Sequence, residues 1–273
     1  MTAQTAPSMD AHPAPLVTLE RVSKRFANGT LALQDMTLAI GAHDFVSFLG
    51  PSGCGKSTAL RLIAGLTAPT AGALNWHRSP QTAAPRTERD LGFVFQEPTL
   101  MPWATVFDNV WLPLRLAGIA RDAADTTVRE ALAMVGLTKF AAVYPRELSG
   151  GMKMRVSIAR ALVTQPQLLL MDEPFAALDE MTRTKLNNDL LSIWREHRFT
   201  VIFVTHSVYE SVYLSDRIVV MAPRPGRVID EIRIDEPYPR HSSDFHVSTR
   251  YNEHVKRVQR ALHGTMDGVA VDH

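Results

Sequence analysis

Four continuous apolar runs, each no longer than five residues, punctuate the chain at 45–49, 168–171, 201–204 and 218–221. Continuous apolar runs of this length, bounded by turn or helix signals, are typical of strands buried on both faces. Between and after these runs, helical patterns occupy 57–64, 122–135, 151–163 and 180–197, and the first two end at Gly65 and Gly136. Strands separated by helices predict a parallel sheet covered on both faces, the α/β class.

Two other segments have a different pattern. Residues 16–40 alternate more regularly and contain the turn pair Asn28 and Gly29, which predicts a small antiparallel sheet beside the parallel one. Residues 97–160 hold no comparable strand run, which predicts a helical insertion. Its expected interruptions are Pro98, Pro102, Pro113 and Pro145.

These patterns divide the chain into three parts. Residues 1–15, rich in Ala, Pro and Thr, are expected to form a flexible tail. Residues 16–230 form the main domain, with the helical insertion inside it. Residues 231–273 form an extension of unassigned role, which begins with a polar, proline-containing region and carries a short final helix near 248–262.

Composition limits the cellular compartment and the kinds of partner that we expect for the chain. The net charge of +1 over 273 residues offers none of the basic field typical of nucleic-acid binding, so we expect no nucleic-acid partner. A single cysteine, Cys54, rules out an internal disulfide and favours a reducing compartment. No apolar run approaches the length of a membrane-spanning helix, and the first 15 residues lack the features of a signal peptide. We therefore expect a cytoplasmic protein.

A glycine-rich loop directly follows the first buried run and opens a helix. Its residues are Gly50, Pro51, Ser52, Gly53, Cys54, Gly55, Lys56, Ser57 and Thr58. The spacing of Gly50, Gly55, Lys56 and Ser57 fits the phosphate-binding loop of nucleotide-binding proteins. The glycines let backbone N–H groups face phosphate oxygens, Lys56 neutralises phosphate charge, and the Ser57 hydroxyl is placed to bind Mg²⁺. Cys54 occupies a variable place in this loop, and we interpret its thiol as a bystander.

Two further features carry candidate chemistry. Asp172 and Glu173 follow the second buried run, where Asp172 would hold Mg²⁺ and Glu173 would polarise an attacking water as a general base. Alone, the pair would fit an ordinary strand exit equally well, and the phosphate loop favours the catalytic interpretation. Ser149, Gly150 and Gly151 open another helix and form a second anion-binding arrangement, although such a triplet alone more often marks a helix cap.

Six motifs in one order identify a resemblance. They are the loop at 50–58, Gln96 after Phe93, Val94 and Phe95, the 148–151 segment, Asp172 with Glu173, Asp179 after Ala177 and Leu178, and His206. Their order and spacing over residues 16–227 are similar to those of ATP-binding cassette (ABC) ATPases. The resemblance implies a P-loop NTPase (RecA-like) parallel sheet, a flanking antiparallel β subdomain and an inserted helical signature subdomain.

The resemblance also implies roles. These ATPases work as a head-to-tail pair, so Ser149, Gly150 and Gly151 of one subunit would close over ATP held by the loop of the other. Gln96 would join the Mg²⁺ and water shell. His206 would hold the γ-phosphate, Asp179 would couple the two sites, and Phe26 would stack on adenine. The alternatives are a solvated loop residue at 96, a strand-end histidine at 206 and a core aromatic at 26.

Two residues depart from the family's pattern. Met152 stands where Gln usually follows the two signature glycines, and Ala176 stands where Ser is common. Met152 removes a side-chain amide near the start of the signature helix, but the Ser149 hydroxyl and the glycine amides remain. We therefore expect phosphate binding to survive, with a possible effect on rate.

The resemblance further implies a type of machine. A chain with one phosphate loop must pair with a copy of itself or a close relative, and separate ATPase subunits of this size are typical of importers. Transmembrane permease subunits would be direct partners and a solute-binding protein an indirect one, which places the chain on the inner face of the membrane. A soluble role in DNA repair or translation is the alternative.

The segment after Gln96 resembles that of one subgroup within the family. Residues 100–110 carry Trp103 and Phe107, which would either receive a permease helix or pack inside the helical insertion. Together with Met152, this segment resembles the subgroup that serves nitrate, sulfonate, taurine and similar small solutes.

Overall fold

A computed structural model describes residues 15–77, 90–240 and 242–267. The expected tail, apart from Pro15, lies outside the described residues. The central feature is a mixed sheet in the strand order β5-β6-β7-β3-β8-β9, in which all neighbours are parallel except β8 and β9. Its strands are β3 (Phe45–Leu49), β5 (Leu91–Val94), β6 (Leu168–Asp172), β7 (Thr200–Thr205), β8 (Arg217–Ala222) and β9 (Arg227–Arg233).

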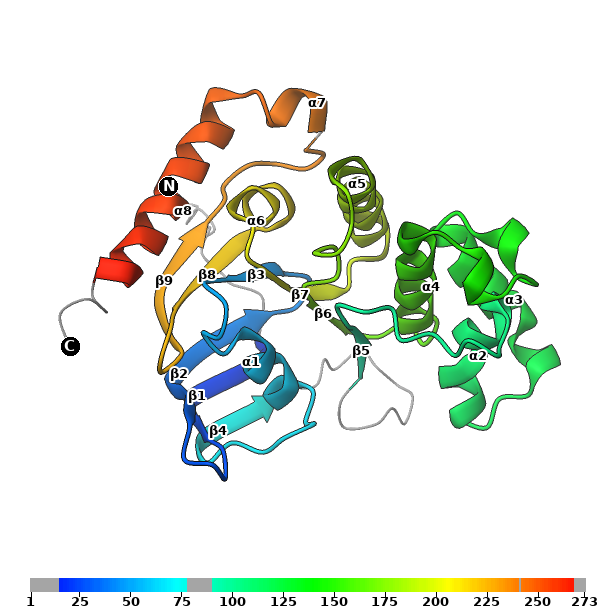
Figure 1. Cartoon of the computed structure of the whole chain (residues 1–273), viewed down its shortest axis with the longest axis horizontal. Coiled ribbons are helices and arrows are strands. Elements are labelled where there is room, and N and C mark those ends of the chain that lie inside the picture. Colours follow the sequence, from blue (N-terminus) through cyan, green and yellow to red (C-terminus); the bar gives the residue numbers. More distant parts are fainter. Residues whose placement is uncertain (1–14, 78–89, 241, 268–273) are drawn as a thin grey trace, which may run out of the picture.

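The four apolar runs form the middle of this sheet, as predicted. Every residue of β3 and β7 is buried because both faces of the sheet are covered. Phe45 and Leu49 belong to the apolar cluster with the helices α4 (Gly150–Leu162), α5 (Glu180–His197) and α6 (Val208–Leu214). Val46 and Phe48 belong to a second cluster with α1 (Lys56–Ile63) and the antiparallel sheet. The layers are visible in Figure 1, and the α/β prediction is confirmed.

Two strands of this sheet were not predicted. β5 is only four residues long and contains Gly92, where an added Cβ would lie 2.5 Å from the carbonyl oxygen of Ala161. The glycine is required by the close approach of the helix α4 (Gly150–Leu162), a cause that the local pattern does not reveal. β9 is mostly exposed at the sheet edge and therefore lacks a buried run.

The smaller sheet is antiparallel, in the order β2-β1-β4. β1 (Pro15–Arg25) and β2 (Leu31–Gly41) form the predicted hairpin, and Gly29 takes a positive φ of 86° in the turn between them. β4 (Ala71–Trp76) joins from beyond α1 (Lys56–Ile63) and was not predicted, because none of its residues is fully buried.

The predicted helical insertion contains α2 (Val106–Leu116), α3 (Arg121–Met134), two short 3₁₀ turns (Thr138–Phe140 and Pro145–Glu147) and α4. α2, α3 and α4 pack against one another. The expected interruption at Pro113 is wrong, since this residue lies inside α2. Proline costs a helix one hydrogen bond but keeps a helical φ, and the buried face of α2, which includes Val110 and Leu114, holds the helix against its neighbours.

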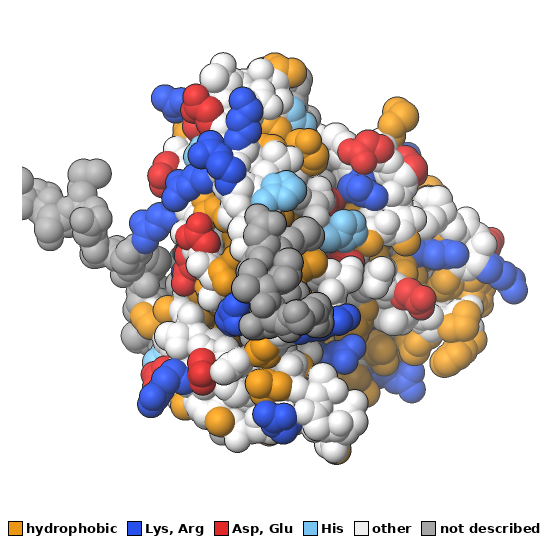
Figure 2. All heavy atoms as spheres, turned by 60° about the vertical axis from the view of Figure 1, so that its left-hand side comes forward, with side chains coloured by type: hydrophobic (Ala, Val, Ile, Leu, Met, Phe, Trp, Pro, Cys, Tyr) orange, Lys and Arg blue, Asp and Glu red, His pale blue; other side chains and the backbone are white. Residues whose placement is uncertain are grey.

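The C-terminal part covers the opposite end of the sheet. α5 (Glu180–His197) and α6 (Val208–Leu214) precede it, and α7 (Ser242–Phe245) and α8 (Thr249–Asp267) follow β9. The final helix was predicted, and it is longer than expected. It buries Tyr251, Val255 and Val258 against the body of the protein. Figure 2 shows a row of Lys and Arg side chains along its outer face, which matches the exposure of Arg250, Lys256, Arg257 and Arg260.

None of the helices in the described ranges is both long and apolar enough to cross a membrane.

Candidate functional site

The glycine-rich loop connects the end of β3 to the first turn of α1. Gly53 and Gly55 take positive φ angles of 77° and 91°, which L side chains rarely adopt. At Gly50 a Cβ would lie 2.6 Å from the carbonyl oxygen of Met221, so the loop is packed directly on β8. Gly55 precedes α1 and, having no side chain, offers no side-chain cap to the first N–H groups of the helix. A loop of this shape at a helix N-terminus fits phosphate oxygens.

Lys56 is folded back over this loop. Its ammonium group donates hydrogen bonds to the carbonyl oxygens of Gly50 (2.8 Å) and Pro51 (3.1 Å), and the residue is only 4% exposed. Cys54 Sγ lies 3.9 Å from the same nitrogen, and burial raises the pKa of the Cys54 thiol. The side chain of Cys54 belongs to the apolar cluster beneath the loop, so a phosphate would meet only its backbone.

Ser57 and Asp172 are joined directly. Ser57 Oγ donates a hydrogen bond of 2.8 Å to Asp172 Oδ1, linking the first turn of α1 to the end of β6. Burial raises the pKa of the Asp172 carboxyl, and the hydrogen bond from Ser57 opposes that shift. A hydroxyl and a carboxylate in contact are hard oxygen donors, the set that Mg²⁺ takes from a protein while water and substrate phosphates supply its remaining ligands. The two side chains therefore fit a Mg²⁺ site.

Glu173 lies between two nitrogen groups. Its Oε1 is 3.8 Å from Lys56 Nζ and its Oε2 is 3.4 Å from His206 Nδ1. The residue has a φ of 47°, and its N–H donates to the carbonyl oxygen of Val204 on the neighbouring strand, which fixes the turn after β6. The Glu173 side chain is 23% exposed, so its carboxylate is accessible to water. This position suits a general base beside a phosphate held by Lys56.

His206 follows β7 and precedes α6. Ser207 caps α6 by accepting a hydrogen bond from the N–H of Glu210 (3.3 Å), and its own N–H donates to Thr205 Oγ1 (3.0 Å). These bonds fix the backbone on both sides of His206, whose side chain is 57% exposed. The exposed ring faces Glu173, so it is not a buried core histidine.

Gln96 and Phe26 lie at the margins of this cluster. Gln96 is exposed and follows β5 by two residues, and since Val94 pairs with Met171 it sits at the same sheet edge as Asp172. Phe26 is 40% exposed, with Lys24 Nζ 5.5 Å from its ring centroid, and its exposure contradicts the core alternative. The adenine-stacking role of Phe26 stays a prediction.

Ser149, Gly150 and Gly151 lie away from the phosphate loop. Ser149 caps α4 by accepting from the N–H of Met152 (3.3 Å), and Ser149 and Gly150 are exposed. Figure 1 shows α4 beside α2 and α3, across β5 and β6 from α1. The second anion-binding arrangement is therefore well separated from the phosphate loop of the same chain.

The start of α5 packs beside this second arrangement. At Gly151 a Cβ would lie 2.6 Å from Thr182 Cγ2, so α4 and α5 are in close contact there. Asp179 caps α5 by accepting from the N–H of Thr182 (2.9 Å), and that hydrogen bond lowers the pKa of the Asp179 carboxyl. Asp179 is exposed beside the Ser149 segment and is free to meet another chain.

The two aromatic residues at 103 and 107 differ in solvent exposure. Phe107 is 5% exposed and packs in the insertion with Arg121 above its ring, whereas Trp103 is 77% exposed. The core alternative therefore holds for Phe107, and Trp103 remains available on the surface.

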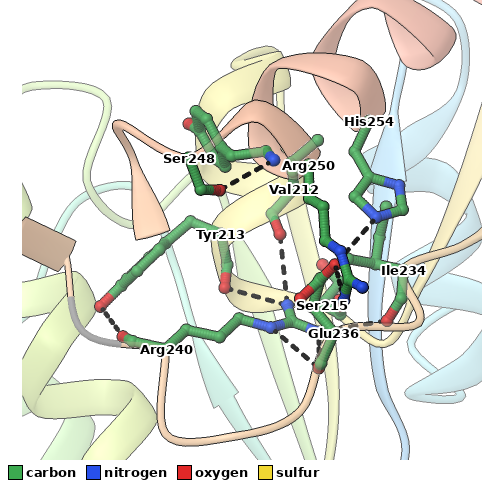
Figure 3. A network of polar contacts seen from close by, with 10 residues as sticks. Val212, Tyr213, Ser215, Ile234, Glu236, Arg240, Ser248, Arg250 and His254 are labelled. Carbon is green, nitrogen blue, oxygen red and sulfur yellow. Dashed lines mark hydrogen bonds and ion pairs between the residues drawn. The ribbon is translucent and has the colours of Figure 1, made fainter. Parts of the chain in front are cut away.

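Sequence reasoning missed the side chains that hold α6. Arg240 is 4% exposed and donates to the carbonyl oxygens at the end of α6, those of Val212 (3.2 Å), Tyr213 (3.1 Å) and Ser215 (2.8 Å). It also reaches the carbonyl oxygens of Ile234 and Glu236, as Figure 3 shows. A cation that satisfies the last carbonyls of a helix stabilises it. Only proline flanks at 237 and 239 hint at this fixed segment in the sequence.

The chain is similar in sequence to known proteins over most of its length. Residues 33–176 match the family model described as ABC transporter. The chain is 41% identical to a taurine import ATP-binding protein of Rhizobium johnstonii, over 89% of this chain and 93% of that protein. It is 42% identical to an aliphatic sulfonates import ATP-binding protein of Bacillus cereus, over 82% of this chain and 88% of that protein.

Solved structures agree with these matches. A dimeric ATP-binding cassette in a post-hydrolysis state, bound to ADP and phosphate, aligns with a TM-score of 0.69 and 34% identity, over 81% of this chain and all of that one (100%). CbiO1 of Clostridium perfringens, part of an ABC transporter complex, aligns with a TM-score of 0.73 and 26% identity, over 91% of this chain and 98% of that one.

Proposed function

This chain belongs to the ABC transporter family and is an ATPase of that family, and from this premise we propose that it is the ATP-hydrolysing subunit of an importer. ATP binding would close two such chains head to tail, closure would move separate permease subunits, and hydrolysis would reset the pair. The names of the relatives from Rhizobium johnstonii and Bacillus cereus support an importer.

One observation carries the head-to-tail arrangement. The phosphate loop and the Ser149 segment are both built to receive anions, and they lie on opposite sides of β5 and β6. We infer that one ATP would not bridge both in a single chain, so each chain would supply half of two sites. A pair related by a two-fold axis completes both sites with the same contacts. The dimeric solved cassette bound to ADP and phosphate supports this arrangement.

The residues of the loop side then have separable roles. Lys56 would exchange its bonds to Gly50 and Pro51 for phosphate oxygens, which neutralises charge on the β- and γ-phosphates. Ser57 and Asp172 would hold Mg²⁺, with Gln96 contributing to its water shell. Bound Mg²⁺ would supply charge stabilisation for the phosphoryl group that is transferred.

Glu173 and His206 would activate and orient the attacking water. A water molecule attacks the γ-phosphorus, the bond from that phosphorus to the β–γ bridging oxygen breaks, and Glu173 accepts the proton of the water. His206, 3.4 Å from Glu173, would orient that water and hold the γ-phosphate. Products are ADP and inorganic phosphate.

The permease contact is proposed for the segment before α2. Trp103 is exposed there, next to the buried Phe107 that anchors the segment in the insertion. An exposed aromatic on a rigid support suits the docking of a permease helix. This contact would place the chain on the cytoplasmic face of the membrane, with a solute-binding protein as an indirect partner. The solute would be a small molecule of the taurine, sulfonate or nitrate type, and the relatives' names support taurine and aliphatic sulfonates.

Affinity purification from membranes tests the proposal. A tagged Glu173→Gln chain, produced in its own cells, should bind ATP without turnover and be recovered with a polytopic membrane protein. The wild-type chain, washed with ATP and Mg²⁺, is the matched control. Recovery only with ribosomes or DNA would contradict transport, and full ATPase activity of Glu173→Gln would contradict the assignment of Glu173.

A further inference from the structure

α5 and α6 lie side by side, and a cavity of about 200 Å³ adjoins their facing side chains. Arg183 of α5 and Glu210 of α6 both line it, together with Asn187 and His246. α5 begins just after Asp179, and α6 begins just after His206. The cavity therefore lies between the two helices that follow the coupling and γ-phosphate residues.

Arg183 is tied to the Asp179 side. Its Nη2 donates to the carbonyl oxygen of Leu178 (3.0 Å), the residue before Asp179, and its Nη1 donates weakly to Glu180 (3.4 Å). Its Nε is buried and makes no hydrogen bond within the part of the chain that the structure describes. The Nη2 end of Arg183 is thus held by Leu178, while its buried Nε–H donor is left without a hydrogen bond in the described ranges.

Glu210 is tied to the His206 side. Its Oε2 accepts a hydrogen bond of 2.5 Å from Thr205 Oγ1, and Thr205 Oγ1 in turn accepts from the N–H of Ser207 (3.0 Å). These two bonds bracket His206. Glu210 Oε1 is buried and, among the described residues, has no hydrogen-bond partner.

These two atoms, which make no hydrogen bond among the described residues, face each other. Arg183 Nε and Glu210 Oε1 are 3.8 Å apart, within ion-pair range but about 1 Å longer than a charge-assisted hydrogen bond. Both side chains are largely buried, at 24% and 12% exposed. A buried donor and acceptor left unsatisfied at such a distance favour closing the gap, because an unmade hydrogen bond is costly there. The adjoining cavity gives the side chains room to move.

We propose that Arg183 and Glu210 form a positioning pair that couples the Asp179 segment to the His206 segment. A partner chain that meets Asp179 displaces Leu178, Arg183 follows its carbonyl oxygen, the pair closes, and Glu210 draws Thr205 and His206 with it. Ordering of His206 at one ATP site thereby depends on contact made at the other. This inference rests on the proposed function, because it needs the roles of Asp179 and His206.

A double-mutant cycle on the full-length dimer tests the pair. Arg183→Gln, Glu210→Gln and the double variant are compared in steady-state ATP hydrolysis. Each single substitution should lower kcat about tenfold with the KM for ATP within about twofold, and the double should lower it no further than either single. The Hill coefficient for ATP should fall toward 1. Two independent tenfold losses that multiply in the double variant, or an unchanged Hill coefficient, would overturn the pair.

Two controls keep the result interpretable. Arg129→Gln breaks the exposed Arg129–Asp125 ion pair of α3 (2.8 Å) and should leave kcat unchanged. If Arg183→Gln fails to fold, the cycle is repeated with Arg183→Lys and Glu210→Asp. Both substitutions keep the charge of the side chain but change the length or shape of the group that forms the pair. Folded conservative variants with wild-type kcat and Hill coefficient would overturn the proposal. Glu173→Gln is assayed beside them: if it abolishes turnover while the cycle is multiplicative, the coupling pair fails and the proposed ATPase site stands.

Discussion

Ser57 Oγ donates a 2.8 Å hydrogen bond to Asp172 Oδ1, which links the helix after the phosphate loop to the strand that carries the acidic pair. Both side chains are oxygen donors at the carboxyl edge of a parallel sheet, where ligands of such sheets bind. The contact holds the proposed metal ligands together before any metal or nucleotide arrives. Binding then needs little rearrangement of these two groups.

Asp172→Asn should stabilise the protein in the absence of nucleotide and Mg²⁺. Because burial raises the folded-state pKa of Asp172 above its unfolded value, its favourable contribution to folding is present below the unfolded pKa and is lost as pH rises through the folded pKa. Asparagine keeps an acceptor for Ser57 without the charge. The urea midpoint should therefore rise at pH 7, and the gain should shrink as the pH falls toward the unfolded pKa of 3.8.

The exposed Asp230→Asn is the matched control and should not change the midpoint at either pH. A lower midpoint for Asp172→Asn at pH 7 would show that the ionised carboxylate stabilises the free chain, contrary to this account.

Gly151→Ala should weaken the contact between α4 and α5. The new methyl group would lie 2.6 Å from Thr182 Cγ2, and relief of that clash should cost about 1–3 kcal/mol of unfolding free energy. Thr182→Ser removes the opposing methyl group and keeps the N–H that Asp179 accepts. Adding Thr182→Ser should therefore restore most of the loss, as measured by urea unfolding. A double variant as unstable as Gly151→Ala alone would mean that the clash is not the cause.

Arg240→Ala should destabilise the protein by about 3 kcal/mol, because it leaves several buried carbonyl groups at the end of α6 without a donor. Urea unfolding provides the measurement. Arg257→Ala, at an exposed position of α8, should change the unfolding free energy by less than about 0.5 kcal/mol. Equal effects of the two substitutions would show that the buried network is not what holds this segment.

The sequence predicts much of this molecule where one local cause determines the structure. The four buried strands are recognisable because both faces of the sheet are covered, and the phosphate loop because its glycine positions need unusual backbone angles. The proximity of Ser57 and Asp172 follows from both lying at the same edge of a parallel sheet.

The remaining features depend on contacts between distant segments. Gly92 is a strand residue because α4 approaches it, and Pro113 stays helical because α2 is packed on two sides. The facing of Arg183 and Glu210 depends on how α5 and α6 pack. Arg240 contacts α6 from more than 20 residues away in sequence, and a local sequence pattern does not reveal a contact between such distant residues.

Mixing two inactive variants tests the shared site most directly. Lys56→Ala removes phosphate neutralisation from the loop, and Gly150→Asp places a carboxylate at the exposed anion site, where a Cβ meets only ordinary contact with Leu178 (3.5 Å). Each variant alone should be inactive. In a head-to-tail heterodimer both defects fall in one site and the other site is intact, so a 1:1 mixture should regain ATP hydrolysis, up to about a quarter of the wild-type rate. A mixture as inactive as its components would contradict a site built from two chains.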